Sequence, residues 1–270
     1  MVDCTLVVSS CDKYEDAWYP FFELLKKYWP ELSDYPIVMI TETKMCNHKG
    51  LEIKTLHPEN VDDSWSKRLL HCLSQIQTKY IIFSLEDFFI QKQVENQEIL
   101  KCVERMKKDP EIAVFYFKRV SDSWKESEFK EYFEATPDLK YRLNAQMAIW
   151  NREILMEFLD EKENPWEFEI LGSQRIKDTK KKLYCHKVSD IYSNLEGVFP
   201  YIVGKHNGYG IAQGKWMWNN KKLFKKHRIK VKLSGLGVAP KWHYGIGVVS
   251  KIRNTVFPPL VRLRDTFRKM

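Results

Sequence analysis

The most constraining feature of the chain is a short apolar run that ends in two adjacent carboxylates. Residues 79–90 read KYIIFSLEDFFI, so Glu86 and Asp87 interrupt an otherwise apolar segment. An apolar run of this length is typical of a buried strand in a parallel sheet. Because carboxylates are rarely buried without partners, the pair is expected at the rim of that sheet, where open α/β sheets bind their ligands. Such a pair suits a divalent metal that holds a diphosphate; the alternative is a turn that Glu86 starts and Asp87 caps.

Strands and helices alternate along the first 90 residues. Apolar and β-branched runs predict strands, and apolar residues at helical spacing predict helices. The expected strands are residues 4–10, 36–41, 52–56 and 79–85, and the expected helices are 16–29 and 63–77. This order predicts a mostly parallel sheet that is covered by helices on both faces.

The remainder continues the pattern less regularly. We expect helices at 96–108, at 152–159 and from Asn164 onward, and strands at 112–117, 144–150, 183–188 and 198–203. Residues 120–140 show weak periodicity and are expected to be irregular. Polar and apolar residues alternate from Asn144, which predicts that one face of that strand meets a wet environment. The predicted fold class is therefore α/β, with a single Rossmann-type mixed sheet flanked by helices.

Composition limits the compartment and the class of protein. Of 270 residues, 44% are hydrophobic, which is enough for a sizeable core. The six cysteines include no C-x-x-C pair, and no apolar run approaches the roughly 20 residues that span a bilayer. The first strand begins almost at once, so no signal peptide is expected. We therefore predict a reducing, cytoplasmic location.

Charge is unevenly distributed. Residues 226–270 carry eleven Lys/Arg and one acid, whereas residues 1–225 carry 33 basic and 35 acidic residues. We therefore divide the chain into a near-neutral body, residues 1–225, and a basic extension, residues 226–270. Basic residues interleaved with apolar ones favour contact with an anionic membrane surface. The apolar residues in question are Trp242, Phe257, Leu260, Leu263 and Phe267. A solvated tail is the alternative, and a nucleic-acid contact is not expected.

Several familiar nucleotide and hydrolase motifs are absent. The sequence has no G-x-G-x-x-G after the first strand, no G-x-x-x-x-G-K-[ST] and no G-x-S-x-G. These absences disfavour a dinucleotide oxidoreductase, a P-loop enzyme and an α/β-hydrolase. A nucleotide site built from strand ends and a metal is the remaining option for an α/β body.

The order of five short segments resembles the glycosyltransferases of the GT-A fold, specifically the small bacterial enzymes of cell-surface polysaccharide synthesis (O-antigen or capsule). The segments are SSCD at 9–12, WSKR at 65–68, LED at 85–87, NAQMAIW at 144–150 and NPWEFE at 164–169. The resemblance covers about residues 3–220 and implies a GT-A-like sheet. It departs from the family's D-x-D metal motif because Ser84 or Leu85 stands in place of the first Asp.

The resemblance implies roles for individual residues. Ser9, Ser10, Asp12, Glu42, Arg68 and Glu86 would contact the nucleotide-sugar. Asp87 would bind Mn²⁺ or Mg²⁺, and His206 would complete the metal shell, unless it is only a turn histidine. Either the metal or Arg68 would stabilise the leaving diphosphate.

The same resemblance places a general base at a helix start. Glu167 is the first candidate and Glu169 the second; being two residues apart, they point to different helix faces. The alternative for Glu167 is a surface charge favoured by the helix dipole. Gln146, Trp150 and Trp166 are the expected acceptor contacts, with the indoles able to stack on sugar rings.

Together these features predict a peripheral membrane glycosyltransferase on the cytoplasmic face. It would transfer a sugar, with inversion, from a UDP-sugar to a surface glycan such as lipopolysaccharide or to a lipid-linked precursor. Two alternatives remain open at this point. One is a sugar-nucleotidyltransferase, whose glycine-rich basic first loop is missing here, and the other is a non-enzymatic binding module.

Overall fold

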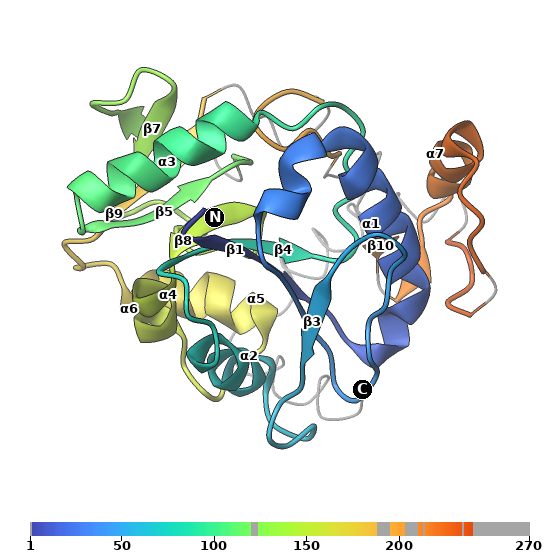
Figure 1. Ribbon diagram of the computed structural model, residues 1–270. Helices are drawn as coiled ribbons and strands as arrows, with labels where there is room; N and C mark the ends of the chain where they lie inside the picture. The colour runs from blue at the N-terminus through green and yellow to red at the C-terminus, as the bar shows by residue number, and fades with distance from the viewer. Residues whose placement is uncertain are drawn as a thin grey trace, which may run out of the picture.

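A nine-stranded mixed sheet forms the centre of the molecule (Figure 1). The computed structural model describes residues 2–119, 124–187, 195–202, 210–212, 214–233 and 235–239. The strand order is β3-β2-β1-β4-β8-β5-β9-β7-β6. Their bounds are β1 Cys4–Ser9, β2 Ile37–Ile40, β3 Ile53–Leu56, β4 Tyr80–Leu85, β5 Ile112–Tyr116, β6 Trp124–Glu126, β7 Tyr132–Ala135, β8 Ala148–Asn151 and β9 Lys182–His186.

Strand direction brings the ends of the parallel strands to one edge. β1 pairs in parallel with β2 and β4, β2 with β3, and β5 with β9, whereas β8 is antiparallel to both β4 and β5. β1, β2, β3, β4, β5 and β9 therefore all end at the same edge, which we call the carboxyl edge. The chain that enters β8 starts from this edge as well. The predicted mostly parallel sheet is confirmed.

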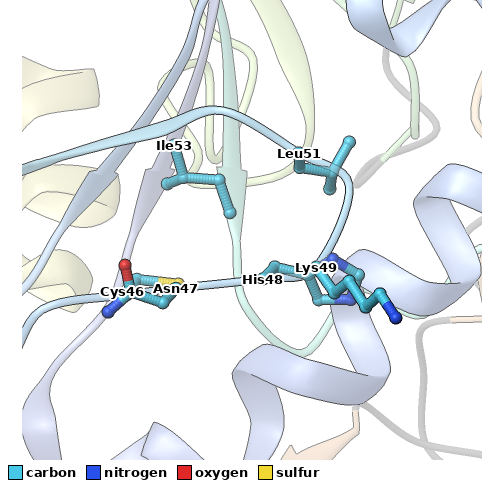
Figure 2. Close-up of a pocket in the computed structure, with 6 residues that line it drawn as sticks. All are labelled: Cys46, Asn47, His48, Lys49, Leu51 and Ile53. Carbon is cyan, nitrogen blue, oxygen red and sulfur yellow. The ribbon is translucent and has the colours of Figure 1, made fainter.

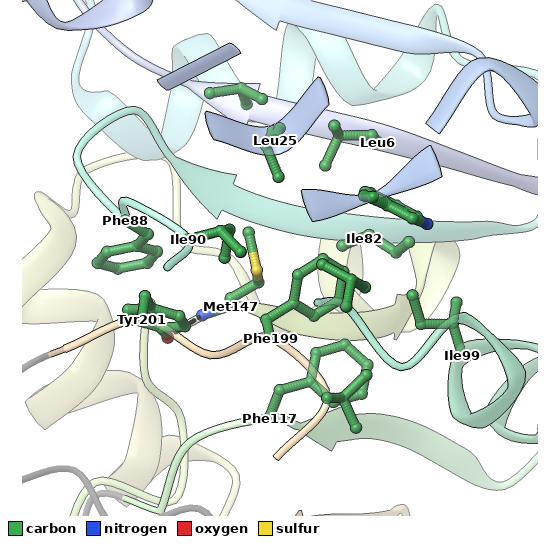
Figure 3. Close-up of a cluster of buried hydrophobic side chains, with 14 of the residues drawn as sticks. Leu6, Leu25, Ile82, Phe88, Ile90, Ile99, Phe117, Met147, Phe199 and Tyr201 are labelled. Atoms are coloured by element: carbon green, nitrogen blue, oxygen red, sulfur yellow. Dashed lines mark hydrogen bonds between the residues drawn. The ribbon is translucent and has the colours of Figure 1, made fainter. Parts of the chain in front are cut away.

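Helices cover both faces of the sheet. Alternating residues of β1 define the two sides: Leu6 and Val8 belong to one buried cluster, and Val7 belongs to the other. The first cluster lies under α1 Glu15–Tyr28 and α3 Asn96–Lys108 (Figures 1 and 3). The second lies under α2 Trp65–Ser74 and α4 Arg152–Phe158. The shorter helices are η1 Asp12–Tyr14, η2 Pro30–Asp34, α5 Pro165–Glu167, the π-helical turn η3 Phe168–Gly172 and α6 Ser173–Arg175.

Local sequence explains where these helices begin. Ser64 precedes α2, and its hydroxyl accepts a hydrogen bond from the Lys67 N–H, as the predicted N-cap requires. Asn164 precedes α5, where Pro165 occupies the first helical position without losing a hydrogen bond. The predicted helix at 96–108 coincides with α3.

Three stretches differ from the expectation. Residues 120–140, expected to be irregular, contribute β6 and β7, an edge pair whose short strands leave little periodic signal. The strand expected at 144–150 begins only at Ala148, because the Ala145 N–H donates to Glu169 instead of to a neighbouring strand. Residues 198–202 form no strand; their carbonyls accept isolated hydrogen bonds from Gln91 and Glu95.

The C-terminal described segment packs on the body. A hairpin of β10 Ile211–Ala212 and β11 Lys215–Trp216 leads into α7 Asn220–His227, which crosses the expected boundary after residue 225. The Ala239 N–H donates to the Trp216 carbonyl at 2.8 Å, and Ala239 is buried. Residues 226–239 are thus joined to the body, and the five apolar residues from Trp242 to Phe267 lie outside the described residues. No helix within the described ranges is both long and apolar enough to cross a bilayer.

We expect a chain cut after residue 225 to be less stable than a chain cut after residue 239. The shorter chain interrupts α7 and loses Ile229, Val231 and Ala239, which pack against the core. Each such apolar contact contributes about 1 kcal/mol, so the melting temperature should fall by about 5–10 °C. Thermal unfolding followed by circular dichroism measures this difference. Equal melting temperatures would contradict the packing of residues 226–239 on the body.

Candidate functional site

The candidate site lies along the carboxyl edge, where the loops after β1, β2 and β4 follow adjacent strands. These loops carry Ser9, Asp12, Glu42 and the pair Glu86 and Asp87. The structure thereby brings together residues that lie up to 78 positions apart in the sequence. The edge of the sheet explains their proximity, since parallel strands end side by side.

Glu86 and Asp87 are both buried, with exposed fractions of 5% and 8%. Burial, together with the neighbouring charge of Asp87, raises the pKa of Glu86 well above its usual value. Burial also raises the pKa of Asp87 to about 6, although a hydrogen bond from the Ile211 N–H partly opposes the shift. The fold therefore holds two carboxylates where their negative charge is costly. A bound cation would remove that cost.

The C-terminal hairpin closes over this pair. Asp87 Oδ2 accepts the Ile211 N–H at 2.9 Å, and the Asp87 carbonyl accepts the Gly210 N–H at 3.2 Å. A Cβ atom on Gly210 would lie 2.3 Å from Phe89 and 2.6 Å from the Asp87 carbonyl, so only glycine allows this approach. One carboxylate oxygen of Asp87 thus anchors the hairpin, and the other has no hydrogen bond to any described residue.

Two indoles fix the serines that follow β1. Trp65 Nε1 donates to Ser9 Oγ at 3.2 Å, and Trp18 Nε1 donates to Ser10 Oγ at 2.8 Å. Trp65 comes from α2 and Trp18 from α1, which lie on opposite faces of the sheet. The β1 loop is therefore held from both sides.

Asp12 and Glu42 join the β1 and β2 loops. The Asp12 carboxylate accepts the backbone N–H groups of Glu42, Thr43 and Lys44 and the Thr43 hydroxyl. Burial alone would raise the pKa of Asp12, but the hydrogen bonds from Thr43 and its neighbours lower it. In return, Glu42 accepts the Asp12 N–H at 2.6 Å and the Arg68 guanidinium at 2.8 Å. Both predicted ligand carboxylates are thus engaged in holding the loops and in orienting Arg68.

Glu167 and Glu169 occupy different environments. Glu167 accepts the Asn164 N–H at 3.0 Å and completes a capping box at the start of α5. Glu169 lies in η3, and its Oε1 accepts the Ala145 N–H at 2.8 Å, just before β8. Burial raises the pKa of Glu169, with the Ala145 hydrogen bond opposing the shift. Of the two, Glu169 is the carboxylate tied to the chain that enters β8 from the carboxyl edge.

The three predicted acceptor contacts are placed very differently. Trp150 is 1% exposed and packs edge-on against Tyr116 and Phe158 in the core, so its ring is not available to a ligand. Gln146 is buried and accepts a hydrogen bond from the Tyr201 hydroxyl. Trp166 is 62% exposed on α5. Trp150 is buried because β8 lies between β4 and β5 in the sheet. The apolar run of residues 144–150 does not by itself reveal this central position.

One cationic residue of this edge was missed. Lys118 follows β5, is 1% exposed, and lies 5.3 Å above the ring of Tyr201. Phe88, which directly follows the acidic pair, also stacks on Tyr201, with the ring centroids 4.7 Å apart (Figure 3). The sequence contains a signal for this residue, because Lys118 follows an apolar strand just as Glu86 does.

The acidic pair offers the oxygen ligands that Mg²⁺ and Mn²⁺ prefer. Within the described ranges, no group of three or more His, Cys, Asp or Glu side chains is arranged as a complete metal site. His206, the other expected ligand, lies outside the described residues. Among the described residues, Glu86 and Asp87 are thus the two carboxylates at this edge that could contribute to a cation site.

A separate cavity of about 320 Å³ lies in the loop between β2 and β3 (Figure 2). Cys46, Asn47, His48 and Ile53 are among its lining residues. The side chain of His48 is 1% exposed, and its Nε2 lies 3.1 Å from Glu23 Oε1. The lining residues do not include the acidic pair, although most of them lie in the loop that also carries Glu42.

The fold is similar to that of residues 1–349 of TarS from S. aureus. The two share 13% identity over 96% of this chain and 76% of that one, with a TM-score of 0.50. The alignment with the longer TarS chain has a TM-score of 0.46 at 14% identity, covers 95% of this chain and spans 44% of that one. A cytidylyltransferase from Leptospira borgpetersenii aligns over 97% of this chain and 99% of its own, at 10% identity and a TM-score of 0.44.

At these identities the similarity to TarS establishes the fold alone. It confirms the predicted fold class, a GT-A-like, Rossmann-type mixed sheet flanked by helices. No protein-family model matches the chain, and no curated protein sequence matches it.

We expect Gly210→Ala to destabilise the protein by about 1–3 kcal/mol, because the added methyl group overlaps Phe89 and the Asp87 backbone. Gly235→Ala is the matched control, since its Cβ would meet only the mobile end of the Asp16 side chain. Urea unfolding gives the free energy for each variant. Equal unfolding free energies for both variants would show that the hairpin does not approach Asp87 this closely.

Proposed function

We propose that the chain is a glycosyltransferase that transfers a sugar from a UDP-sugar to a hydroxyl group of a surface glycan, with inversion. The observation that carries this proposal is the buried Glu86 and Asp87 pair at the carboxyl edge, where Glu42, at the end of β2, also holds the guanidinium of Arg68. TarS residues 1–349 have also been solved with UDP-GlcNAc and with UDP, which supports a nucleotide-sugar as donor.

The chemistry requires compensation of negative charge. As the glycosidic bond to the diphosphate breaks, charge builds on the leaving phosphate oxygens. Arg68 offers a guanidinium whose orientation is fixed by Glu42, so little entropy is lost when it meets a phosphate. When bound at Glu86 and Asp87, Mg²⁺ or Mn²⁺ would add electrostatic stabilisation of the same charge.

Glu169 is the favoured general base. The acceptor hydroxyl must lose its proton as it attacks the sugar carbon, and a carboxylate with a raised pKa accepts that proton more readily than an ordinary one. The pKa of Glu169 is raised by burial, and the Ala145 N–H fixes its orientation. Glu167, by contrast, already serves the N-terminus of α5. We therefore assign the base to Glu169 and a capping role to Glu167.

The cellular setting belongs to the same proposal. A lipid-linked acceptor would place the enzyme at the cytoplasmic face of a membrane, with the basic residues beyond 239 as the contact. The eleven cations and single acid of residues 226–270 support such a contact with anionic lipid.

We expect UDP and UDP-sugars to raise the melting temperature, more strongly with manganese than without, because a ligand that binds the native state stabilises it. Arg68→Ala should abolish this shift. Lys67→Ala is the matched control, since Lys67 is exposed on the same helix and pairs only with Asp63. Thermal shift provides the measurement.

Product analysis separates glycosyl transfer from nucleotidyl transfer. A glycosyltransferase releases UDP from a UDP-sugar. A nucleotidyltransferase releases pyrophosphate from a nucleoside triphosphate and a sugar 1-phosphate. Release of pyrophosphate without release of UDP would show that the chain is a nucleotidyltransferase instead. If the Arg68→Ala variant still binds UDP, the donor does not bind at this edge of the sheet.

We expect Glu169→Gln to abolish transfer while stabilising the fold at neutral pH. Because the folded state raises the pKa of Glu169, ionising it costs more in the folded protein than in the unfolded chain. This cost builds up as pH rises from the ordinary pKa of a glutamate to the raised pKa of the folded state, is complete above it and vanishes in acid. The amide still accepts the Ala145 N–H but cannot take a proton.

Paired measurements of melting temperature and UDP release across pH test this expectation. The variant should melt above the wild type at neutral pH and match it in acid. Glu167→Ala, which loses only the capping interaction, should retain transfer and lose about 1 kcal/mol of stability. Retained turnover in Glu169→Gln would remove Glu169 from the mechanism.

A further inference from the structure

A second cavity, of about 300 Å³, lies between the loop of residues 137–141 and the helical segment α5–η3–α6. This volume is at the lower end of the range for small-ligand pockets. From the helical segment and its continuation, Ile170, Gln174 and Lys177 line the cavity. Trp166 lies in α5, four residues before Ile170, and the π-helical turn η3 begins between them. Trp166 and Ile170 are both exposed.

The two walls of the cavity are firmly joined, so the cavity is preformed. Arg142 Nη1 donates to the carbonyls of Ile176 and Lys177, both at 2.9 Å. The Leu143 N–H donates to Ser173 Oγ at 2.8 Å. The next contact along the same junction is the hydrogen bond from Ala145 to Glu169. The cavity and the candidate base therefore lie along one junction between loop and helix.

Tyr141 lines the cavity in a backbone conformation that non-glycine residues seldom adopt, with φ at +57°. A residue with a Cβ pays of order 1 kcal/mol or more for this region. Strain of this kind is retained where the surrounding structure uses it. Tyr141 is one of the lining residues of the cavity, and the Lys140 ammonium lies 5.4 Å from the centre of its ring.

The lining is suited to a sugar ring. Tyr141 and the exposed Ile170 offer apolar surface for the C–H face of a pyranose, and Gln174 offers an amide that both donates and accepts hydrogen bonds. The remaining rim groups are charged: Asp138 and Lys177 pair at 3.0 Å, and Lys140 adds a second ammonium.

We propose that the stretch from Trp166 to Lys177 is the binding track of an oligosaccharide acceptor. The cavity under Tyr141 holds a sugar unit beyond the one whose hydroxyl reaches Glu169. The inference rests on the proposed function, and it specifies that function further: the acceptor is a glycan of at least two units rather than a monosaccharide or a lipid phosphate.

An array of defined mono- and oligosaccharides, probed with the full chain in the presence of UDP and manganese, tests the proposal. The wild type should bind oligosaccharides in preference to their monosaccharide components. The oligosaccharide that binds the wild type most tightly is then titrated into the wild type and into each variant by isothermal titration calorimetry. Tyr141→Gly should weaken its binding about tenfold, since loss of an aromatic contact is worth up to about one order of magnitude in affinity.

Tyr141→Gly is expected to fold, because glycine adopts the positive φ without strain, and its melting temperature should equal or exceed that of the wild type. A second variant, Gln174→Ala with Lys177→Ala, changes only exposed side chains of the opposite wall and should also weaken oligosaccharide binding. Tyr19→Ala, which removes an exposed aromatic ring from α1, is the control and should bind as the wild type does.

Three results would overturn the proposal. In the first, the wild type is stabilised by UDP but binds no oligosaccharide. In the second, both variants bind the oligosaccharide as tightly as the wild type does. In the third, the wild type binds monosaccharides as tightly as oligosaccharides. Loss of binding to anionic vesicles in Trp166→Ser, with glycan binding intact, would assign the face to a lipid surface instead. A wild type that no nucleotide stabilises would count against the proposed function itself.

Discussion

The structure depends on the burial of two adjacent carboxylates at the end of a parallel strand. Ionised carboxylates are costly away from water, and the fold offsets this cost only in part, with the N–H that Ile211 donates to Asp87 among the contributors. The C-terminal hairpin therefore owes its position to the same side chain that is the proposed metal ligand. The hydrogen bond that holds the C-terminal hairpin in place therefore also fixes the Asp87 carboxylate of the proposed donor site.

Much of this architecture follows from the sequence. The parallel core strands, both helical layers and the N-caps at Ser64 and Asn164 are determined by local patterns that tertiary contacts reinforce. The errors fall where pairing is non-local. The hairpin of β6 and β7 is an edge with little apolar signal, and residues 198–202 look like a strand but have no neighbouring strand to pair with. Sequence periodicity does not report which strands are neighbours, and so it does not reveal that Trp150 lies between two of them.

The site was harder to anticipate than the fold. Sequence position places Asp12, Glu42 and Arg68 at the correct edge, but it does not tell which polar groups face a ligand and which face each other. Asp12 proves to bind the backbone of the neighbouring loop, and Glu42 binds Arg68. Likewise, Glu167 and Glu169 are equivalent in the sequence and differ only in their partners, Asn164 for one and Ala145 for the other.

The hydrogen bond between Asp87 and Ile211 joins residues 124 positions apart. A ribosome delivers the chain from its N-terminus, so both carboxylates and the first four parallel strands emerge long before the N–H that partners Asp87. A nascent chain of 200 residues already contains every strand of the main sheet, yet one of its two rim carboxylates has no partner from the hairpin. The proposed donor site would therefore be complete only late in synthesis, and a chain released early would carry an acidic edge that lacks the Ile211 N–H.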